Sequence, residues 1–367
     1  PDGTFTVKAP ESAPGDHVVL RAEMDIYVVV SACPQDMNDT CGGTPTDIRV
    51  EVGRGIDGGH QAGLQRGDHV LNLDRRKKSV AVPSLGPVAQ REGYARLETD
   101  VTDRAMVRAV LREFAPDAVI HLAAISDDDP DALVDGEIGG TFAVLEASRQ
   151  YFDKLTGDAR DRFRIVQVER AESDVPETLT RAQAARGAAA ALMDRWARAN
   201  DLPLVTCVAG EAFGPWQPNT SFFARLVASL LYRNAFAIPA GGETVRDWLP
   251  IRDLAAGLLC AASAAQPQSR YDLSVGAERR DADLAESVCG LLDERLPLQS
   301  GMLWSNCLSI EGDGSQASAG PMLDSHEAER DLGWRPQGFH TGLDRLMTWA
   351  LASHAASQAR HAAVAAE

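Results

Sequence analysis

The stretch from Asp47 to Asp74 constrains the fold most strongly, because it joins two apolar strand patterns through a glycine-rich turn and a short helical segment. Gly53, Gly55 and Gly58 fit the spacing G-x-G-x-x-G, and Asp74 follows Gly53 by 21 residues. In a dinucleotide-binding unit, such glycines permit a tight turn beside a pyrophosphate, and the acid binds the adenosine ribose. Because the chain contains 31 glycines, the spacing alone is a weak indication, and the flanking sequence must support it.

Downstream of this stretch, short apolar segments rich in β-branched residues alternate with segments of helical apolar spacing. This alternation indicates right-handed βαβ crossovers and therefore an α/β fold, a Rossmann-like doubly wound parallel sheet. The predicted strands are 69–74, 117–124, 163–168 and 202–208, and the predicted helices are 103–114, 140–151 and 181–200.

Composition narrows the function classes. The net charge of −17 and the pI of about 4.9 argue against nucleic acid and anionic membranes as partners, because both are polyanions. Neither a transmembrane-length apolar run nor a basic, apolar leader is recognisable, so we expect a cytoplasmic protein. Cys33 and Cys41 lack zinc-finger spacing, so ordinary thiols are favoured over a metal site, and we predict no metal.

The first 52 residues differ from the rest and predict a short β-rich segment, with apolar runs at His17–Leu20 and Ile26–Val30. The sequence GDHVVLRAEMDIYVVVSACPQDMN, followed by GGTPTDIRVEV, resembles the C-terminal end of the urea carboxylase-associated family. This resemblance implies a remnant of a domain from carboxyguanidine or urea metabolism. The glycines of GRGIDGGHQ then lie at a junction between two sequence types, which reduces them to a possible phosphate loop.

Residues 63–352 resemble the extended short-chain dehydrogenase/reductases, and most closely the dTDP-glucose 4,6-dehydratases. The motifs occur in family order: GDHVLNLDR, LETDVTDRAMVRAVLREFAPDAVIHLAAIS, FGPWQP, ETVRDWLPIRDLAAGL and DLGWRP. The resemblance implies an NAD-binding Rossmann domain over 53–210, a smaller C-terminal substrate lobe over 211–352 that shares segments with it, and a frayed tail over 353–367. It also implies a nucleotide-sugar ligand and a helical dimer face, used with a second copy or with an active homologue.

Several positions match cofactor contacts of that family. Asp74 would bind the adenosine ribose, and Asp100 with Val101 would contact the adenine, although Asp100 fits a helix N-cap nearly as well. His121 favours a hydrogen-bonded structural role. The remaining predicted NAD contacts are Gly53, Gly55, Gly58, Arg75, Leu122, Ala123 and Ala124.

The catalytic positions of the family are mostly replaced. Its Tyr-x-x-x-Lys motif, in which the lysine lowers the pKa of the tyrosine, aligns with Ala182 and Arg186. Its Thr-Asp-Glu run aligns with Arg170, Ala171 and Glu172, so only the glutamate survives. Because loss of one general acid or base typically costs about 10²–10⁴-fold, the sequence predicts impaired catalysis.

Substrate contacts are also altered. Glu211 stands where the family has an asparagine and would bring negative charge towards a sugar diphosphate. Arg246 in RDWL is the candidate for a bidentate diphosphate contact, and an ion pair with Asp247 or another acid is equally favoured. Gln217 and Asn219 are further predicted substrate contacts.

Three hypotheses about function remain open. The chain is a dTDP-glucose 4,6-dehydratase-like protein with impaired catalysis, a non-catalytic nucleotide-binding or dimerisation scaffold, or a fusion or misassembly product that carries a urea-metabolism fragment. Two structural expectations accompany them: a solvated acidic loop at Asp127–Asp131, and packing roles for Trp248, Trp334 and Trp349.

Overall fold

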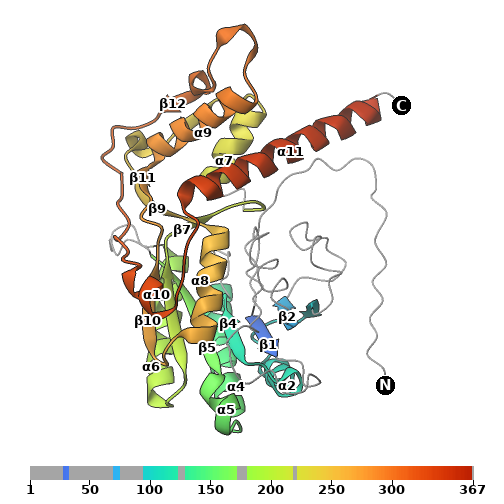
Figure 1. Cartoon of the computed structure of the whole chain (residues 1–367), viewed down its shortest axis with the longest axis vertical. Helices are drawn as coiled ribbons and strands as arrows, with labels where there is room; N and C mark the ends of the chain where they lie inside the picture. Colours follow the sequence, from blue (N-terminus) through green and yellow to red (C-terminus); the bar gives the residue numbers. More distant parts are fainter. Residues whose placement is uncertain are drawn as a thin grey trace.

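A seven-stranded sheet forms the centre of the larger part of the molecule (Figure 1). The structure is a computed structural model, and it describes residues 28–32, 69–74, 94–122, 129–171, 180–217 and 221–365. The predicted Rossmann-like α/β fold is confirmed. In spatial order the strands are β10 (Ser269–Leu273), β6 (Leu204–Ala209), β5 (Arg164–Arg170), β4 (Ala118–His121), β1 (Val28–Ala32), β2 (His69–Asp74) and β3 (Tyr94–Glu98).

One strand of this sheet departs from the sequence prediction. β1 lies between β4 and β2 and runs antiparallel to both, whereas the other neighbouring strands pair in parallel. The expected first strand at 47–52 lies outside the described residues. Central strands of such sheets favour apolar residues on both faces, and Val28–Ala32 is apolar except for Ser31, whereas DIRVEV alternates with charges. The β-rich beginning of the chain therefore contributes directly to the main sheet.

Helices cover both faces of the sheet. On one face, α2 (Arg104–Phe114), α4 (Gly140–Phe152) and α6 (Arg181–Ala199) pack on Val119, Ile165 and Leu204. On the other face, α8 (Ile251–Ala264) and α10 (His326–Asp331) pack on Val166, Val205 and Tyr271. The short α5 (Gly157–Arg162) precedes β5. The three long predicted helices are confirmed to within one residue at each end.

The entry to α4 is more helical than the sequence suggests. Asp129 caps α3 (Pro130–Leu133) by accepting a hydrogen bond from the backbone N–H of Ala132, and Pro130 occupies the first helical turn. A π-helical segment, η2 (Val134–Gly139), then leads directly into α4. The predicted acidic loop Asp127–Asp131 is therefore wrong in its last residues, because Asp129 is an N-cap and Pro130 and Asp131 belong to α3.

A smaller lobe gathers at one end of the molecule (Figure 1). It contains the sheet β11–β9–β7, the pair β12–β8, and helices that bury an aromatic cluster around Trp248, Phe213 and Phe223. Its elements are β7 (Glu211–Phe213), α7 (Phe222–Leu231), β8 (Phe236–Ile238), β9 (Val245–Pro250), β11 (Glu278–Arg280), α9 (Asp281–Arg295), β12 (Leu308–Ile310), α11 (Phe339–Ala365) and the 3₁₀ turns Ala240–Gly242, Gln299–Gly301 and Trp304–Cys307.

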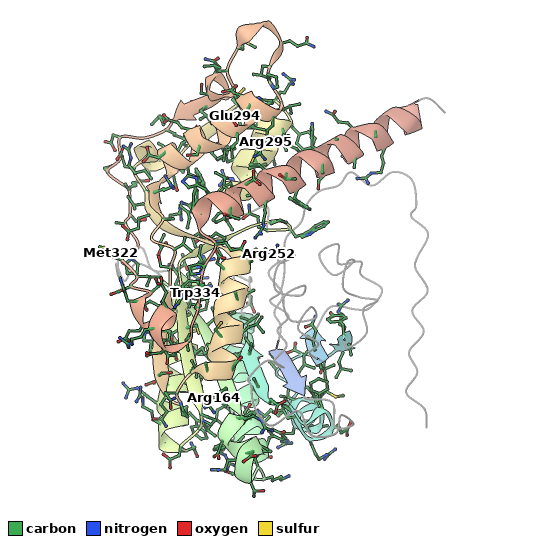
Figure 2. All side chains as sticks on the ribbon, in the orientation of Figure 1. Arg164, Arg252, Glu294, Arg295, Met322 and Trp334 are labelled. Atoms are coloured by element: carbon green, nitrogen blue, oxygen red, sulfur yellow. The ribbon has the colours of Figure 1, made fainter. Side chains whose placement is uncertain are left out.

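The connection between the lobe and the sheet is fixed by α8. The buried Trp334, which lies beside α8 in Figure 2, donates from its indole nitrogen to the carbonyl oxygen of Asp253 at 3.0 Å. At the other end of α8, the guanidinium Nε of Arg164 donates to the carbonyl oxygen of Ala265 at 2.8 Å. The packing roles predicted for Trp248 and Trp334 are confirmed, because both are buried, and Trp349 packs partly buried against the lobe core.

The last helix is longer than expected. The alanine-rich sequence after Trp349 predicts about one further turn and then a frayed tail, but α11 continues to Ala365. Alanine has the highest intrinsic helix propensity, so this composition supports a long helix even where few side chains are buried. Within the described ranges, no helix combines the length and apolar character that a bilayer crossing needs.

Candidate functional site

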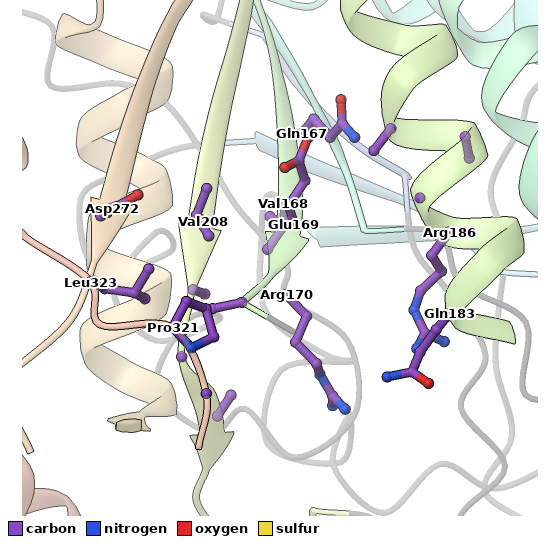
Figure 3. A pocket seen from close by; sticks show the side chains of 18 of the residues that line it. Gln167, Val168, Glu169, Arg170, Gln183, Arg186, Val208, Asp272, Pro321 and Leu323 are labelled. Carbon is purple, nitrogen blue, oxygen red and sulfur yellow. The ribbon is translucent and has the colours of Figure 1, made fainter. Parts of the chain in front are cut away.

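A cavity of about 1120 Å³ lies at the carboxyl ends of β4, β5 and β6. Strand-end side chains form its floor, α6 forms one side, and the segment 319–323 forms another. Figure 3 shows Arg186 and Gln183 on α6 across the cavity from Pro321 and Leu323. In open α/β sheets, ligands bind at the carboxyl edge of the strands, so the cavity has the expected position for a ligand site.

The helix α6 presents one face to the cavity, on which two long polar side chains are followed by the small residues Gly187 and Ala190. Gln183, Arg186, Gly187 and Ala190 line the cavity at positions i, i+3, i+4 and i+7. The helix begins with a capping box, in which Thr180 accepts a hydrogen bond from the backbone of Gln183 while the Gln183 side chain accepts one from the backbone of Thr180. Gln183 therefore has a structural role as well as a place in the cavity wall.

The predicted catalytic positions separate in the structure. Arg186 lines the cavity, whereas Ala182 packs beside Ala185 against Leu133 of α3 and is not among the described cavity-lining residues. Glu172 lies outside the described residues. The structure thus places one charged group of the predicted catalytic set in the cavity, and that group is a guanidinium.

Two ion pairs hold the rim of the cavity. Glu169 at the end of β5 accepts a hydrogen bond from Arg270 of β10 at 2.8 Å, across the intervening strand β6. Arg170 approaches Glu211 of β7 at 3.6 Å between Nη2 and Oε1. The unfavourable charge expected of Glu211 is therefore offset by a neighbouring arginine. Sequence analysis missed Arg270, since its partner is 101 residues away along the chain.

The floor of the cavity is polar. His121, Thr141 and Gln167 are each at most 6% exposed, and all three line the cavity. The Nε2 atom of His121 lies 3.0 Å from the Oγ1 atom of Thr141, which agrees with the hydrogen-bonded role predicted for this histidine. Burial lowers the pKa of His121 to about 4, so its imidazole is neutral at physiological pH. Gln167 and Thr141 were missed because the stretch that contains them, GTFAVLEASRQYFDKLTGDARDRFRIVQV, resembles the family but was given no ligand contact.

The predicted cofactor contacts are only partly described. Asp74 is the last residue of β2 and stands at the carboxyl edge of the sheet, where a ribose-binding acid is expected. Asp100 accepts hydrogen bonds from the backbone and hydroxyl of Thr102, so it forms a turn, and Asp103 is the N-cap of α2 instead. Leu122 lines the cavity. Outside the described residues lie Gly53, Gly55, Gly58, Arg75, Ala123 and Ala124.

Val101 has a packing contact that the sequence did not suggest. A Cβ atom added to Gly140 at the start of α4 would lie 2.9 Å from the Cγ2 atom of Val101. The glycine therefore lets α4 approach the turn that carries Asp100 and Val101.

Arg246 was predicted to bind either a diphosphate or a neighbouring acid. Its guanidinium binds Asp281 through two hydrogen bonds, Nε–Oδ1 at 2.9 Å and Nη2–Oδ2 at 3.2 Å. The structure therefore shows the ion pair, with Asp281 as the partner in place of Asp247. Neither Arg246 nor Gln217 is among the described residues that line the cavity, and Asn219 lies outside the described residues. Their predicted substrate contacts stay predictions.

Metal binding receives no support from the described side chains, among which no group of three or more His, Cys, Asp or Glu residues is arranged to hold an ion. Cys33 and Cys41 lie outside the described residues. Cys207 and Cys289 are buried free thiols, and burial raises the pKa of each to about 12, so both are protonated at neutral pH.

Comparison with known proteins agrees with this geometry. The family model described as "NAD dependent epimerase/dehydratase family" matches residues 53–276, more than half of the chain. A dTDP-glucose 4,6-dehydratase of Shigella flexneri is 26% identical over 314 residues, which cover 78% of this chain and 86% of the relative. A probable dTDP-glucose 4,6-dehydratase of Sinorhizobium fredii is 28% identical over 306 residues, which cover 77% and 85%.

Solved structures show the same fold. The dTDP-glucose 4,6-dehydratase of Bacillus anthracis in complex with NAD matches with a TM-score of 0.62 and 16% identity, covering 76% of this chain and 86% of that one. The UDP-glucose 4-epimerase of Thermotoga maritima with UDP-glucose matches with a TM-score of 0.64 and 18% identity, covering 82% and 97%. The family match begins at residue 53, so the resemblance of residues 1–52 to the urea carboxylase-associated family stays a prediction.

Proposed function

Because the chain belongs to the NAD dependent epimerase/dehydratase family, we propose that it binds NAD and a nucleotide sugar of the dTDP-glucose type but is impaired in dehydration. The relatives named above suggest the ligand class. The observation that carries the impairment is on α6: Arg186 faces the cavity, and Ala182, four residues earlier, packs against Leu133. Neither position supplies the tyrosine–lysine pair that the family resemblance requires for proton removal.

The described residues fit NAD at several points. Asp74 at the end of β2 would hold the adenosine ribose, Asp100 and Val101 would border the adenine, and Arg186 would place a positive charge beside the nicotinamide ribose. When bound, NAD supplies a hydride acceptor for oxidation of a sugar hydroxyl. The chain's own side chains would orient that hydroxyl, but Ala182 has no group that could take its proton.

The phosphate loop is the weakest part of the predicted cofactor site. In the family fold, the glycine turn follows the carboxyl end of a parallel first strand. Here β1 is antiparallel, and its last residue, Ala32, pairs with His69 at the start of β2, on the amino edge of the sheet. The predicted loop at Gly53, Gly55 and Gly58 does not follow β1 directly, because it begins 21 residues after Ala32. β1 therefore cannot hold the loop at the cavity edge as a parallel first strand does, and we expect weaker pyrophosphate binding than in a relative with such a strand.

The experiment is a paired test of binding and turnover with the full chain. Titration calorimetry should detect dTDP-glucose, while incubation with dTDP-glucose and NAD⁺ should yield no 4-keto-6-deoxy sugar absorbance at alkaline pH. The Shigella flexneri relative, assayed in parallel, controls for the reagents. A clear ketosugar signal from this chain would overturn the impairment, and loss of all nucleotide-sugar and NAD binding would leave only the scaffold hypothesis.

Restoring the missing groups tests whether the cavity is otherwise intact. The double variant Ala182→Tyr/Arg186→Lys should gain measurable oxidation of the sugar hydroxyl, seen as NADH absorbance, because the tyrosine–lysine pair takes the hydroxyl proton while NAD⁺ accepts the hydride. Since Ala182 contacts Leu133, the same pair combined with Leu133→Ala should gain more, because the phenol ring then has room to turn towards the cavity. The single variant Leu133→Ala is the control and should remain without turnover.

A further inference from the structure

His121 and Gln167 are neighbours at the carboxyl ends of β4 and β5. The parallel register pairs His121 directly with Gln167, so both side chains project from the same face of the sheet on strands about 4.8 Å apart. Val119 and Ile165, two residues earlier on each strand, face the core beneath α4. The two polar side chains therefore lie on the α4 side, where the core ends and the cavity begins.

Thr141 fixes the imidazole from this helix. Its hydroxyl oxygen lies 3.0 Å from Nε2 of His121, and both side chains are buried. A hydroxyl can donate or accept, so it can match either neutral tautomer of the imidazole. With Nε2 engaged and the ring uncharged, Nδ1 presents either a lone pair or an N–H group.

Two buried polar atoms at the floor have no protein partner. Nδ1 of His121 and Oε1 of Gln167 lack a hydrogen bond to any described residue, although the side chains are only 5% and 6% exposed. Such groups normally have partners, and a buried polar atom without one destabilises the free protein. Both residues line the cavity, so a molecule inside it can supply the missing bonds.

The chemistry of these atoms selects a neutral hydroxyl. Oε1 of Gln167 needs a donor, which phosphate and carboxylate do not have, and the uncharged imidazole offers an anion no charge. The charged residues that line the cavity are balanced in sign, so they select neither an anion nor a cation: Arg170, Arg186 and Arg270 stand with Glu137, Glu169 and Asp272. A hydroxyl donates one hydrogen bond and accepts another, so a single group can serve both atoms.

We propose that His121 and Gln167 form a hydroxyl-binding subsite for the hexose ring of a nucleotide sugar, with Thr141 as the positioning residue for His121. The identity of the ligand rests on the proposed function. The subsite gives a binding role to His121 and Gln167, which lie outside the family's catalytic motifs. The facing positions of α6, Gly187 and Ala190, are small and leave room for the ring.

The test compares ligands with and without the sugar. We titrate the full chain with dTDP-glucose and with dTDP by calorimetry, using the wild type, Gln167→Met, Thr141→Val and Thr141→Ser. The change Gln167→Met keeps the side-chain length but removes Oε1, and it should weaken dTDP-glucose binding by about 10-fold, the worth of one hydrogen bond. Binding of dTDP should stay unchanged. The loss in Thr141→Val should be similar, and Thr141→Ser should restore affinity because the hydroxyl returns.

Ser148→Ala is the matched control. Ser148 of α4 is also fully buried, and its hydroxyl also lacks a partner within the described structure, but it is not among the cavity-lining residues. This variant should bind both ligands as the wild type does. Unfolding in urea checks that each variant is folded, and Gln167→Met should be no less stable than the wild type, because it removes an unpaired amide oxygen.

The outcomes separate the subsite from the proposed function. Equal dTDP-glucose affinity in the wild type and Gln167→Met, with dTDP also bound, would overturn the subsite and leave the proposed function standing. If the chain binds neither dTDP-glucose nor dTDP, the proposed function is rejected. The subsite is then tested by adding methyl α-D-glucopyranoside and recording the ¹⁵N resonance of His121. A ligand-dependent shift of the ¹⁵N resonance of His121 Nδ1 would support it, and an unchanged resonance at saturating sugar would overturn it.

Discussion

Buried polar side chains occur both where the smaller lobe joins α8 and on the cavity floor, and the two groups differ in their hydrogen bonds. At the junction, Asp253 accepts from the backbone N–H groups of Gln337 and Gly338, and within the smaller lobe Asp281 is bound by Arg246. On the floor, His121 and Gln167 each keep an atom without a partner among the described residues. Burial is comparable, since Asp253 and Asp281 are 3% and 0% exposed.

This difference distinguishes structural polar groups from ligand-facing ones. A carboxylate that is satisfied by the protein holds two elements together, and removing its partner must cost stability. A polar atom that the protein leaves unpaired next to a cavity costs stability in the free protein and gains it back on binding. Substitutions at the two kinds of polar group should therefore differ in the size and in the sign of their effect on the free energy of unfolding.

The largest effect is expected at the Arg246–Asp281 pair. Arg246→Met would leave the fully buried Asp281 without its bidentate partner, and we expect a loss of about 3–5 kcal/mol in the free energy of unfolding. Urea unfolding measures this loss.

A double variant and an exposed arginine serve as controls. Arg246→Met/Asp281→Leu should recover most of the loss, because no unpaired charge remains. Arg280 pairs with Glu243 and Asp283 at the surface, where solvent screens the charges, so Arg280→Met should change the free energy of unfolding little. Equal losses for Arg246→Met and Arg280→Met would contradict the structural role assigned to the buried pair.

The sequence predicted the scaffold better than the site. Strands such as 69–74 and helices such as 181–200 carry their periodicity locally, and the structure reproduces them closely. The sequence did not identify the strand beside β4, because Val28–Ala32 and the stretch at 47–52 both carry β-branched residues and only long-range pairing decides between them.

The cavity illustrates the limit of motif matching. The replacements Ala182 and Arg186 were recognisable because they align with a known motif. Gln167 and Arg270 were not, since their roles depend on neighbouring strands that are distant in sequence. For Arg246 the sequence left two roles open; the structure shows an ion pair with Asp281, an acid 35 residues away, and the diphosphate contact stays a prediction.

The pH dependence of stability should reveal His121. Its pKa in the folded protein is about 4, below the ordinary value of 6.5, so the unfolded chain takes up a proton that the folded chain excludes. No penalty exists above pH 6.5, and it grows as the pH falls towards 4. Relative to His121→Asn, which does not titrate, the wild type should lose about 3 kcal/mol between pH 7 and pH 4. Parallel stability curves for the two proteins would show that His121 is not buried as described.

A smaller effect is expected at Asp253. Its two carboxylate oxygens each accept a backbone N–H group at 2.9 Å, whereas an asparagine offers one oxygen and would turn an N–H₂ group towards the other donor. Asp253→Asn should cost about 2 kcal/mol, and hydrogen exchange at Gln337 and Gly338 should become faster. Asp194→Asn, which removes an exposed pair with Arg198, is the control and should have little effect on either measurement.

The smallest effect, and the one of opposite sign, is expected at Ser148. Its hydroxyl is buried in α4 without a partner in the described structure, so Ser148→Ala removes an unsatisfied group and also improves helix propensity. We expect a gain of about 1 kcal/mol in the free energy of unfolding, since the small cavity left by one oxygen offsets part of the benefit. Ser287 in α9 donates to the carbonyl oxygen of Asp283 at 2.8 Å, so Ser287→Ala loses a made bond and should show no comparable gain. A loss of about 1 kcal/mol in Ser148→Ala would mean that a buried polar atom without a partner does not destabilise this protein. The unpaired atoms of His121 and Gln167 would then no longer indicate a ligand, and the contrast with the satisfied carboxylates would fail.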